Sequence, residues 1–289
     1  MKHEKSAFNL AEQLWQKMED GLAPWQKTWK PGYAPGRARN ISTDHLYRGG
    51  NAFWLMMVAS MSGWTNEWIT FAEIAKLGGN IKGQSPTRIE VPLFKKKEDP
   101  VTGEEKEVLY GFRVSTVFNI AQVQDITIQS KEAPNLVESV ASVEMMLEAL
   151  KAQGMSYKEG TDDGCWYQPE TDTVGMPHRG AFEETYEFYA GLAHEMSHAT
   201  MSKGRVERDP VSYAYEELRA EMASTLICST LNLPRTQWHV DNHAAYLKSW
   251  LSEFSDQKPM LLKAAAEAQL IHDYLIALTE QKVELALAA

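Results

Sequence analysis

The 289-residue sequence predicts an α+β protein with two modules, an N-terminal α+β module with a small antiparallel sheet and a mainly helical C-terminal domain with a short edge sheet. Strand-like patterns occur mostly before residue 130, whereas nearly everything from Phe182 onward has helical periodicity. The charge divides at the same place. Residues 1–130 carry 16 Lys and Arg against 14 Asp and Glu, and residues 131–289 carry 13 against 25. This asymmetry indicates two modules with different partners.

Three helices are predicted in the first module. The first covers Lys5–Asp20, where apolar residues recur at helical spacing until Gly21 supplies a stop. A segment broken by proline and glycine follows, and then Ala52–Met61 is predicted as a buried helix. The third covers residues 70–79, which open with a capping box and end at two glycines.

Two strands, Thr87–Phe94 and Val108–Phe118, complete the first module, because both are rich in β-branched and aromatic residues. The charged segment KKKEDPVTGEEKE joins them and is predicted to be a loop. Its lysines, Lys95–Lys97, are followed at once by acidic residues. We therefore interpret them as a solvated hairpin tip rather than a binding patch.

The polar segment between Gln124 and Leu136 predicts a domain boundary near residue 130. The pattern beyond it predicts five helices, at 136–152, 183–203, 212–231, 242–254 and 258–288, and two short strands, at 155–158 and 173–176. The stretch VGMPHRGAF, residues 174–182, is a candidate edge strand that could pair with an extended peptide.

The motif His194-Glu195-Met196-Ser197-His198 matches the pattern HExxH within a predicted amphipathic helix. Residues four apart on a helix point in nearly the same direction, so both imidazoles could bind one ion. Zinc lowers the pKa of a bound water toward ~7, and a glutamate beside the first histidine could take its proton. The motif predicts a Zn²⁺ site, with Mn²⁺ as the alternative ion and Glu195 as the catalytic residue.

A zinc site of this kind needs a third protein ligand, and the next predicted helix offers two glutamates. Glu217 follows His198 at an interval that suits a helix crossing back over the first, so it is the predicted ligand. Glu221 lies one turn further on and is the alternative ligand, or else an acceptor for a hydrogen bond from a ligand histidine. Groups that could stabilise an oxyanion are suggested by residue type only, at Tyr213, Tyr215, His239, His243 and Tyr246.

Aromatic and basic residues alternate in the Pro- and Gly-broken segment of the first module. Bases stack on aromatic rings at ~1–3 kcal/mol each while cations meet phosphates, so this composition suits single-stranded nucleic acid. A hydrophobic core with a solvated basic face explains the same residues equally well. The candidate DNA-binding residues are Trp25, Lys27, Trp29, Lys30, Arg37, Arg39, Tyr47, Arg48 and Asn51.

The remaining composition excludes several classes of protein. The N-terminal residues contain no apolar signal region, and the longest apolar run, Ala52–Ala59, is too short to span a bilayer. The two cysteines, Cys165 and Cys228, fit a reducing compartment better than a disulfide framework. We therefore expect a cytoplasmic protein with no membrane partner.

Several motifs in the same order resemble the ArdC family of plasmid antirestriction proteins, whose N-terminal module also occurs fused to plasmid primases. They are PWQKTW, YRGGN, TFAEIAKLGG and VFNIAQ in the first half, and HEMSH, YAYEELRAE and HAAYLKSWL in the second. The resemblance implies a single-stranded-DNA-binding domain at 1–130 and a zincin-like metallopeptidase domain at 131–289. It also implies protection of incoming plasmid DNA from host restriction during conjugation. By position, the metal ligands fall on His194, His198 and a glutamate of EELRAE.

Three functions are compatible with these residues. The first is an antirestriction protein that binds single-stranded DNA and carries a metal site. The second is an active zinc metalloprotease directed to proteins on DNA, such as host restriction enzymes. The third is an acidic decoy, in which the negatively charged second module mimics DNA. The residues alone leave proteolytic activity and oligomeric state open.

Overall fold

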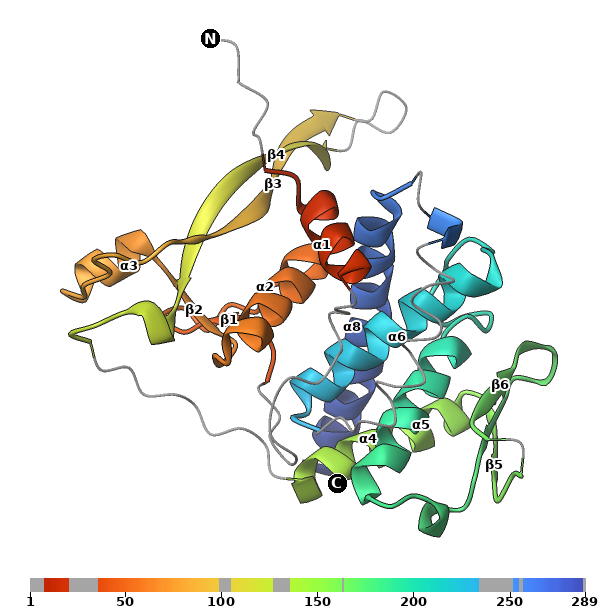
Figure 1. Cartoon of the computed structure of the whole chain (residues 1–289). Coiled ribbons are helices and arrows are strands. Elements are labelled where there is room, and N and C mark those ends of the chain that lie inside the picture. The colour runs from red at the N-terminus through yellow and green to blue at the C-terminus, as the bar shows by residue number, and fades with distance from the viewer. Residues whose placement is uncertain are drawn as a thin grey trace.

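The computed structural model describes residues 8–20, 36–98, 105–126, 136–162, 164–233, 252–254 and 257–287. The predicted α+β class is confirmed: small sheets lie beside a set of packed helices (Figure 1). The predicted boundary near residue 130 lies outside the described residues and stays a prediction.

The first sheet has the strand order β1-β2-β4-β3. β1 (Arg39–Asn40) pairs in parallel with β2 (Glu67–Thr70), and β4 (Glu105–Asn119) pairs antiparallel with both β2 and β3 (Thr87–Glu98). The predicted antiparallel pair is therefore present, and two short strands extend it. The prediction that Lys95–Lys97 lie in a loop is wrong. These lysines belong to β3, because strand pairing continues to Glu98 opposite Glu105.

Three helices accompany this sheet. α1 (Leu10–Glu19) starts where the Asn9 side chain accepts a hydrogen bond from the backbone N–H of Glu12. α2 (Gly49–Ser62) is apolar on most sides and is buried along nearly its whole length. α3 (Phe71–Lys76) begins with the predicted capping box of Thr70 and Glu73.

Four long helices form most of the second half: α4 (Leu136–Ala152), α5 (Thr185–Ala199), α6 (Tyr213–Thr230) and α8 (Met260–Leu287). The second sheet contains β5 (Ser156–Glu159), β6 (Trp166–Gln168) and β7 (Thr173–Met176), in the order β5-β7-β6. Short 3-10 turns occur at η1 (Ile120–Gln122), η2 (Pro169–Thr171) and η3 (Arg179–Ala181). Most of the helix predicted at 242–254 lies outside the described residues.

The second sheet corrects one prediction. The candidate peptide-pairing segment contains β7, which is the middle strand and pairs with β5 on one side and β6 on the other. Its backbone groups are already used in the sheet, so β7 cannot add a further strand. The edges of this sheet are β5 and β6.

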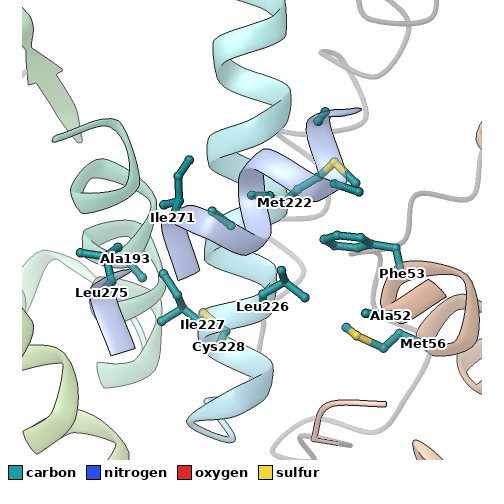
Figure 2. Packing of buried hydrophobic residues seen from close by; sticks show 14 of the residues in the cluster. Ala52, Phe53, Met56, Ala193, Met222, Leu226, Ile227, Cys228, Ile271 and Leu275 are labelled. Carbon is teal, nitrogen blue, oxygen red and sulfur yellow. The ribbon is translucent and has the colours of Figure 1, made fainter. Parts of the chain in front are cut away.

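One continuous group of buried side chains connects the two halves of the chain. Figure 2 shows Phe53 and Met56 of α2 on one side of this group, with Leu226 of α6 and Ile271 of α8 near its centre. α8 therefore buries apolar surface against both halves, which holds the first module against the helices of the second half. Among the helices that the structure describes, none has the length and apolar character needed to cross a membrane.

Candidate metal centre

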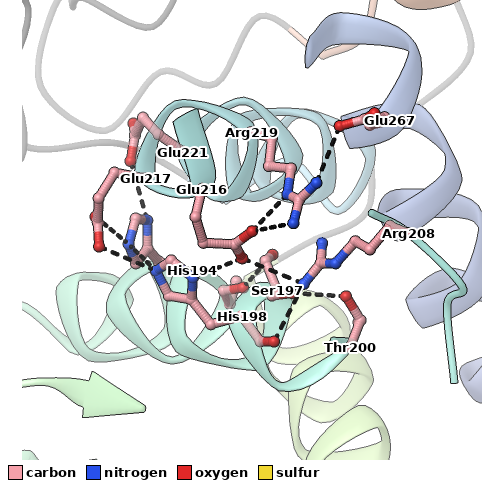
Figure 3. A network of polar contacts seen from close by, with 11 residues as sticks. His194, Ser197, His198, Thr200, Arg208, Glu216, Glu217, Arg219, Glu221 and Glu267 are labelled. Carbon is pink, nitrogen blue, oxygen red and sulfur yellow. Dashed lines mark hydrogen bonds and ion pairs between the residues drawn. The ribbon is translucent and has the colours of Figure 1, made fainter. Parts of the chain in front are cut away.

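The HExxH motif lies near the C-terminal end of α5, and α6 packs alongside it (Figure 3). α5 ends at Ala199, a turn sooner than the sequence predicts, and Arg205 stabilises the turn that follows. Its guanidinium donates to the backbone oxygen of Ala199 and to Asp172. α6 begins where the Ser212 side chain accepts a hydrogen bond from the Tyr215 N–H. This reversal of the chain places the acidic start of α6 over the two histidines.

His194, His198 and Glu217 each offer one ligand atom, and these atoms all lie within 4.8 Å of one another. The two Nε2 atoms are 3.1 Å apart. The carboxylate oxygens of Glu217 lie 3.5 Å from Nε2 of His194 and 3.6 Å from Nε2 of His198. A tetrahedral zinc ion with bonds of ~2.0–2.1 Å needs donor atoms about 3.3 Å apart, so this donor set fits a divalent metal.

Each histidine has a carboxylate behind it. Nδ1 of His194 lies 3.2 Å from Oε2 of Glu221, and Nδ1 of His198 lies 3.0 Å from Oε1 of Glu216. Carboxylates only accept hydrogen bonds, so these contacts keep a proton on Nδ1 and leave Nε2 as the ring atom that could bind a metal. Glu221 thus lies on the side of His194 away from the centre, where it orients the ring.

Sequence reasoning did not identify Glu216, although it belongs to the same EELRAE segment as Glu217. Its carboxylate accepts hydrogen bonds from Arg208 and Arg219, and Arg219 also donates to Glu267 on α8. Figure 3 shows this chain of contacts running from His198 to α8. The ion pair between Glu216 and Arg219 could have been predicted from the sequence, because the two residues are three apart and share a helix face. The partner on α8 could not be found from spacing.

The charges of this cluster shift the pKa values of its members. Burial acts to raise the pKa of Glu217, but hydrogen bonding and the positive charge of His194 outweigh it and lower the pKa to about 2. Burial acts to lower the pKa of His194, yet hydrogen bonds with Glu217 and Glu221 raise it well above its ordinary value. The carboxylates therefore make this site attractive to a cation.

Glu195 is 7% exposed and lines a cavity of about 610 Å³ together with His194 and His198. Burial raises the pKa of its carboxyl, which shifts it toward the range of a general base. Cys165 lines the same cavity. Burial and the charge of Glu195 raise the pKa of its thiol to about 12, so it is a neutral group.

The lining of the cavity also includes the edge strand β6, through Trp166 and Tyr167. Of the oxyanion candidates, Tyr213 also lines the cavity and contributes a hydrogen bond to Glu217. Tyr215 is buried in the core against Phe254. The other three candidates, His239, His243 and Tyr246, lie outside the described residues.

The candidate DNA-binding residues have mixed placements. The first four, Trp25, Lys27, Trp29 and Lys30, lie outside the described residues. Buried Arg37 donates to Gln269 of α8 and to the backbone oxygen of Tyr47, which is itself buried.

The other three candidates, Arg39, Arg48 and Asn51, also form contacts with residues of this protein. Arg39 pairs with Asp44 and Glu67, and Asn51 exchanges hydrogen bonds with the backbone of Glu90. Arg48 is more exposed and pairs with Asp273 of α8. This segment thus helps to attach the first module to α8, and its contact with DNA stays a prediction.

The fold and the site together define a zincin-like metallopeptidase domain joined to a second, N-terminal unit. Residues 142–267 match the zincin-like metallopeptidase family, and residues 5–118 match the N-terminal domain of the anti-restriction factor ArdC. The chain belongs to the ArdC family of antirestriction proteins.

The solved structures of ArdC are similar over nearly the whole chain. The metal-free antirestriction ArdC protein from the R388 plasmid is 29% identical, with a TM-score of 0.73 over 94% of this chain and 97% of that chain. Its Mn(II)-bound structure has a TM-score of 0.70 at 27% identity, over 93% of this chain and 96% of that chain.

Two curated proteins are also similar in sequence. A DNA primase TraC of Escherichia coli is 31% identical over 95% of this chain. The match covers only 20% of the length of the primase. An uncharacterized protein y4eC of Sinorhizobium fredii is 30% identical over 92% of this chain and 90% of its own length.

Proposed function

We propose that this chain is an antirestriction protein that binds single-stranded DNA, carries a Zn²⁺ site and protects incoming DNA from host restriction during conjugation. The single observation that carries the proposal is the structural likeness to antirestriction ArdC over 94% of the chain. One functional unit would cover residues 1–130 and the other residues 131–289. The bacterial cytoplasm is the proposed location, where incoming DNA meets restriction enzymes.

The proposed ligands are His194, His198 and Glu217. Zinc would be bound through Nε2 of each ring and one carboxylate oxygen, a donor set typical of zinc sites. Mn²⁺ is the alternative, because the ArdC protein of the R388 plasmid has a Mn(II)-bound structure. When bound, such an ion supplies Lewis-acid chemistry and a more acidic water.

The proposed catalytic residue is Glu195, whose carboxylate lies beside the two histidines in the cavity wall. Because burial raises its pKa, it could accept a proton at Oε from a nucleophilic water and return it to a leaving group. Cys165, as a neutral thiol, adds apolar surface beside Glu195. Tyr213 holds Glu217 through its hydrogen bond.

The test compares wild type with Glu195→Gln in a restricting host, using Glu183→Gln on the exposed approach to α5 as a control with the same change in charge. Metal content is measured by elemental analysis, and protection is measured as the yield of transferred plasmid. The proposal expects protection by wild type and the control, with about one metal ion per chain. A wild-type chain that gives no protection would reject it.

A second candidate function is proteolysis of proteins bound to DNA, favoured by the position of β6 beside the cavity. An extended peptide could add to the edge of β6 that faces away from β7 and pass between Trp166 and the HExxH helix. This candidate expects that Glu195→Gln keeps its metal ion and its DNA binding but loses protection. Protection equal to that of wild type in this variant would rule it out.

A further inference from the structure

β3 and β4 form a long two-stranded arm, defined as residues 88–98 and 105–116, that extends past α1 and α2 (Figure 1). Pairing begins at Thr87 with Val117 and continues to Glu98 with Glu105, with one irregularity between Leu93 and Phe94. The side chains of the outer half of the arm are exposed on both faces. This half includes the lysines that the sequence predicts in a loop.

The strand register separates the charges of the arm onto its two faces. Alternate residues of a strand point to opposite faces, and residues paired across two strands share a face. By this rule one face carries Lys95, Lys97, Lys106 and Arg113, and it carries no Asp or Glu among the described residues of the arm. We call it the basic face.

The opposite face has a different composition. It carries four glutamates and two cations, namely Glu90, Glu98, Glu105, Glu107, Arg88 and Lys96. Within this face, Nζ of Lys96 lies 2.7 Å from Oε2 of Glu105. The described acidic residues next to the lysines, Glu98, Glu105 and Glu107, are therefore directed away from the basic face.

An exposed aromatic ring lies within the basic face. Tyr110 is 57% exposed and is placed at the irregularity of the pairing. Nζ of Lys95 lies 5.9 Å from the centre of its ring, which puts the ring beside the cations. A cationic surface with an exposed aromatic ring is the combination that contacts phosphates and stacks a base.

We propose that the basic face of the arm binds a strand of single-stranded DNA, with its cations on the phosphates and Tyr110 stacked on a base. The inference rests on the proposed DNA binding and assigns it to this surface. The positive charge of the basic face suits a polyanion, and the placement of the arm's exposed apolar side chains favours a nucleic acid strand over a membrane. The arm's exposed Phe94, Leu109 and Phe112 lie on the opposite, acidic face, whereas a membrane-binding surface would combine them with the cations.

The experiment compares two double variants with the same change in charge. Lys95→Gln with Lys97→Gln removes two cations from the basic face, and Arg88→Gln with Lys96→Gln removes two from the opposite face. Binding of a fluorescent oligo-dT to the full chain is measured by anisotropy at several salt concentrations. Thermal unfolding verifies that each variant is folded.

Each phosphate that a variant no longer neutralises should reduce the slope of log affinity against log salt by ~0.7. The basic-face variant should therefore lower the slope by about 1.4 and the affinity at 0.1 M salt by roughly 25-fold. The control variant should bind like wild type. Tyr110→Ala should weaken binding roughly 5- to 150-fold, and Tyr110→Phe should retain it.

Two results would overturn the assignment. If wild type binds DNA and the two double variants bind it with equal affinity, the basic face is not the binding surface and the proposed function survives. If the basic-face variant instead loses binding to vesicles with anionic lipids while its DNA binding is unchanged, the surface serves a membrane. A wild-type chain that binds no oligonucleotide rejects the proposed function itself.

Discussion

Nδ1 of His198 and Oε1 of Glu216 lie 3.0 Å apart, and Glu216 in turn contacts Arg208 and Arg219. The orientation of one proposed metal ligand therefore depends on a carboxylate that two arginines hold in place. Arg219 extends this chain of contacts to Glu267 on α8. The same helix carries Gln269 and Asp273, which contact the first module.

Replacing Glu216 should weaken metal binding without removing a ligand. Glu216→Gln keeps the shape of the side chain but loses the charge that makes His198 a better donor, so we expect a ~10–100-fold lower affinity. Competition with a chromogenic chelator measures the affinity, and exposed Glu207→Gln is the control with the same change in charge. An unchanged affinity for the metal would mean that Glu216 only binds Arg208 and Arg219 and does not support His198 as a ligand.

Glu217 and Glu221 should differ in their effect on the metal. Glu217 faces Nε2 of both histidines, whereas Glu221 contacts Nδ1 of His194. We expect Glu221→Gln to lower metal affinity by ~10–100-fold and Glu217→Gln to lower it further. Elemental analysis after dialysis against a graded series of chelator concentrations ranks the two variants. The reverse order would assign the third ligand to Glu221.

His272 should make the stability of the protein depend on pH. It is 4% exposed, with Nε2 lying 2.8 Å from Oγ1 of Thr230. Burial lowers its pKa below the ordinary 6.5, against the raising effect of Asp273. The unfolded chain thus takes up a proton at a higher pH than the folded chain. The contribution of neutral His272 to the free energy of unfolding is fully present above pH 6.5. It is lost as the pH falls below 6.5, by at most about 1.4 kcal/mol per pH unit.

Urea unfolding between pH 7.5 and 5 tests this dependence in wild type and His272→Gln. The free energy of unfolding should fall less steeply with decreasing pH in the variant. The other titrating groups are shared by the two proteins, so the difference between the slopes reports on His272. Parallel slopes would contradict the prediction.

Gly175 should not tolerate a side chain. It is paired with Trp166 across β7 and β6, and an added Cβ would overlap the indole ring. Gly175→Ala must displace Trp166, so we expect a loss of ~1–3 kcal/mol in stability together with a changed cavity wall. Gly180→Ala is the control, because its added Cβ would meet nothing within 4 Å. Equal stability of the two variants in chemical denaturation would contradict this packing of Trp166 on Gly175.

The elements that depend on local patterns could be predicted from the sequence. Helical periodicity located α1, α4, α6 and α8 to within a few residues, because an amphipathic or apolar helix repeats its burial every three to four residues. The capping box at Thr70 was visible because its two residues are only three apart. The HExxH motif is local in the same sense, since one turn of helix fixes the direction of both rings.

Features that depend on distant residues could not be predicted in the same way. The charged segment after Phe94 has the composition of a loop, and only its pairing with β4 makes it a strand with a basic face. The segment that contains most of β7 was a candidate edge strand, but β5 and β6 pair with both of its edges. Strand pairing joins residues far apart in the chain. A period-two pattern therefore predicts which side chains share a face of the strand, but not what packs against that face or which strands pair with it.

The sequence by itself determined the α+β class, the helix that carries His194, Glu195 and His198, and the resemblance to the ArdC family. Only the tertiary structure decided that Glu217 faces the Nε2 atoms of both histidines while Glu221 and Glu216 lie behind the rings. The reason is geometric. Spacing along one helix fixes which side chains share its face, whereas the crossing of two helices decides which atoms of the two faces meet.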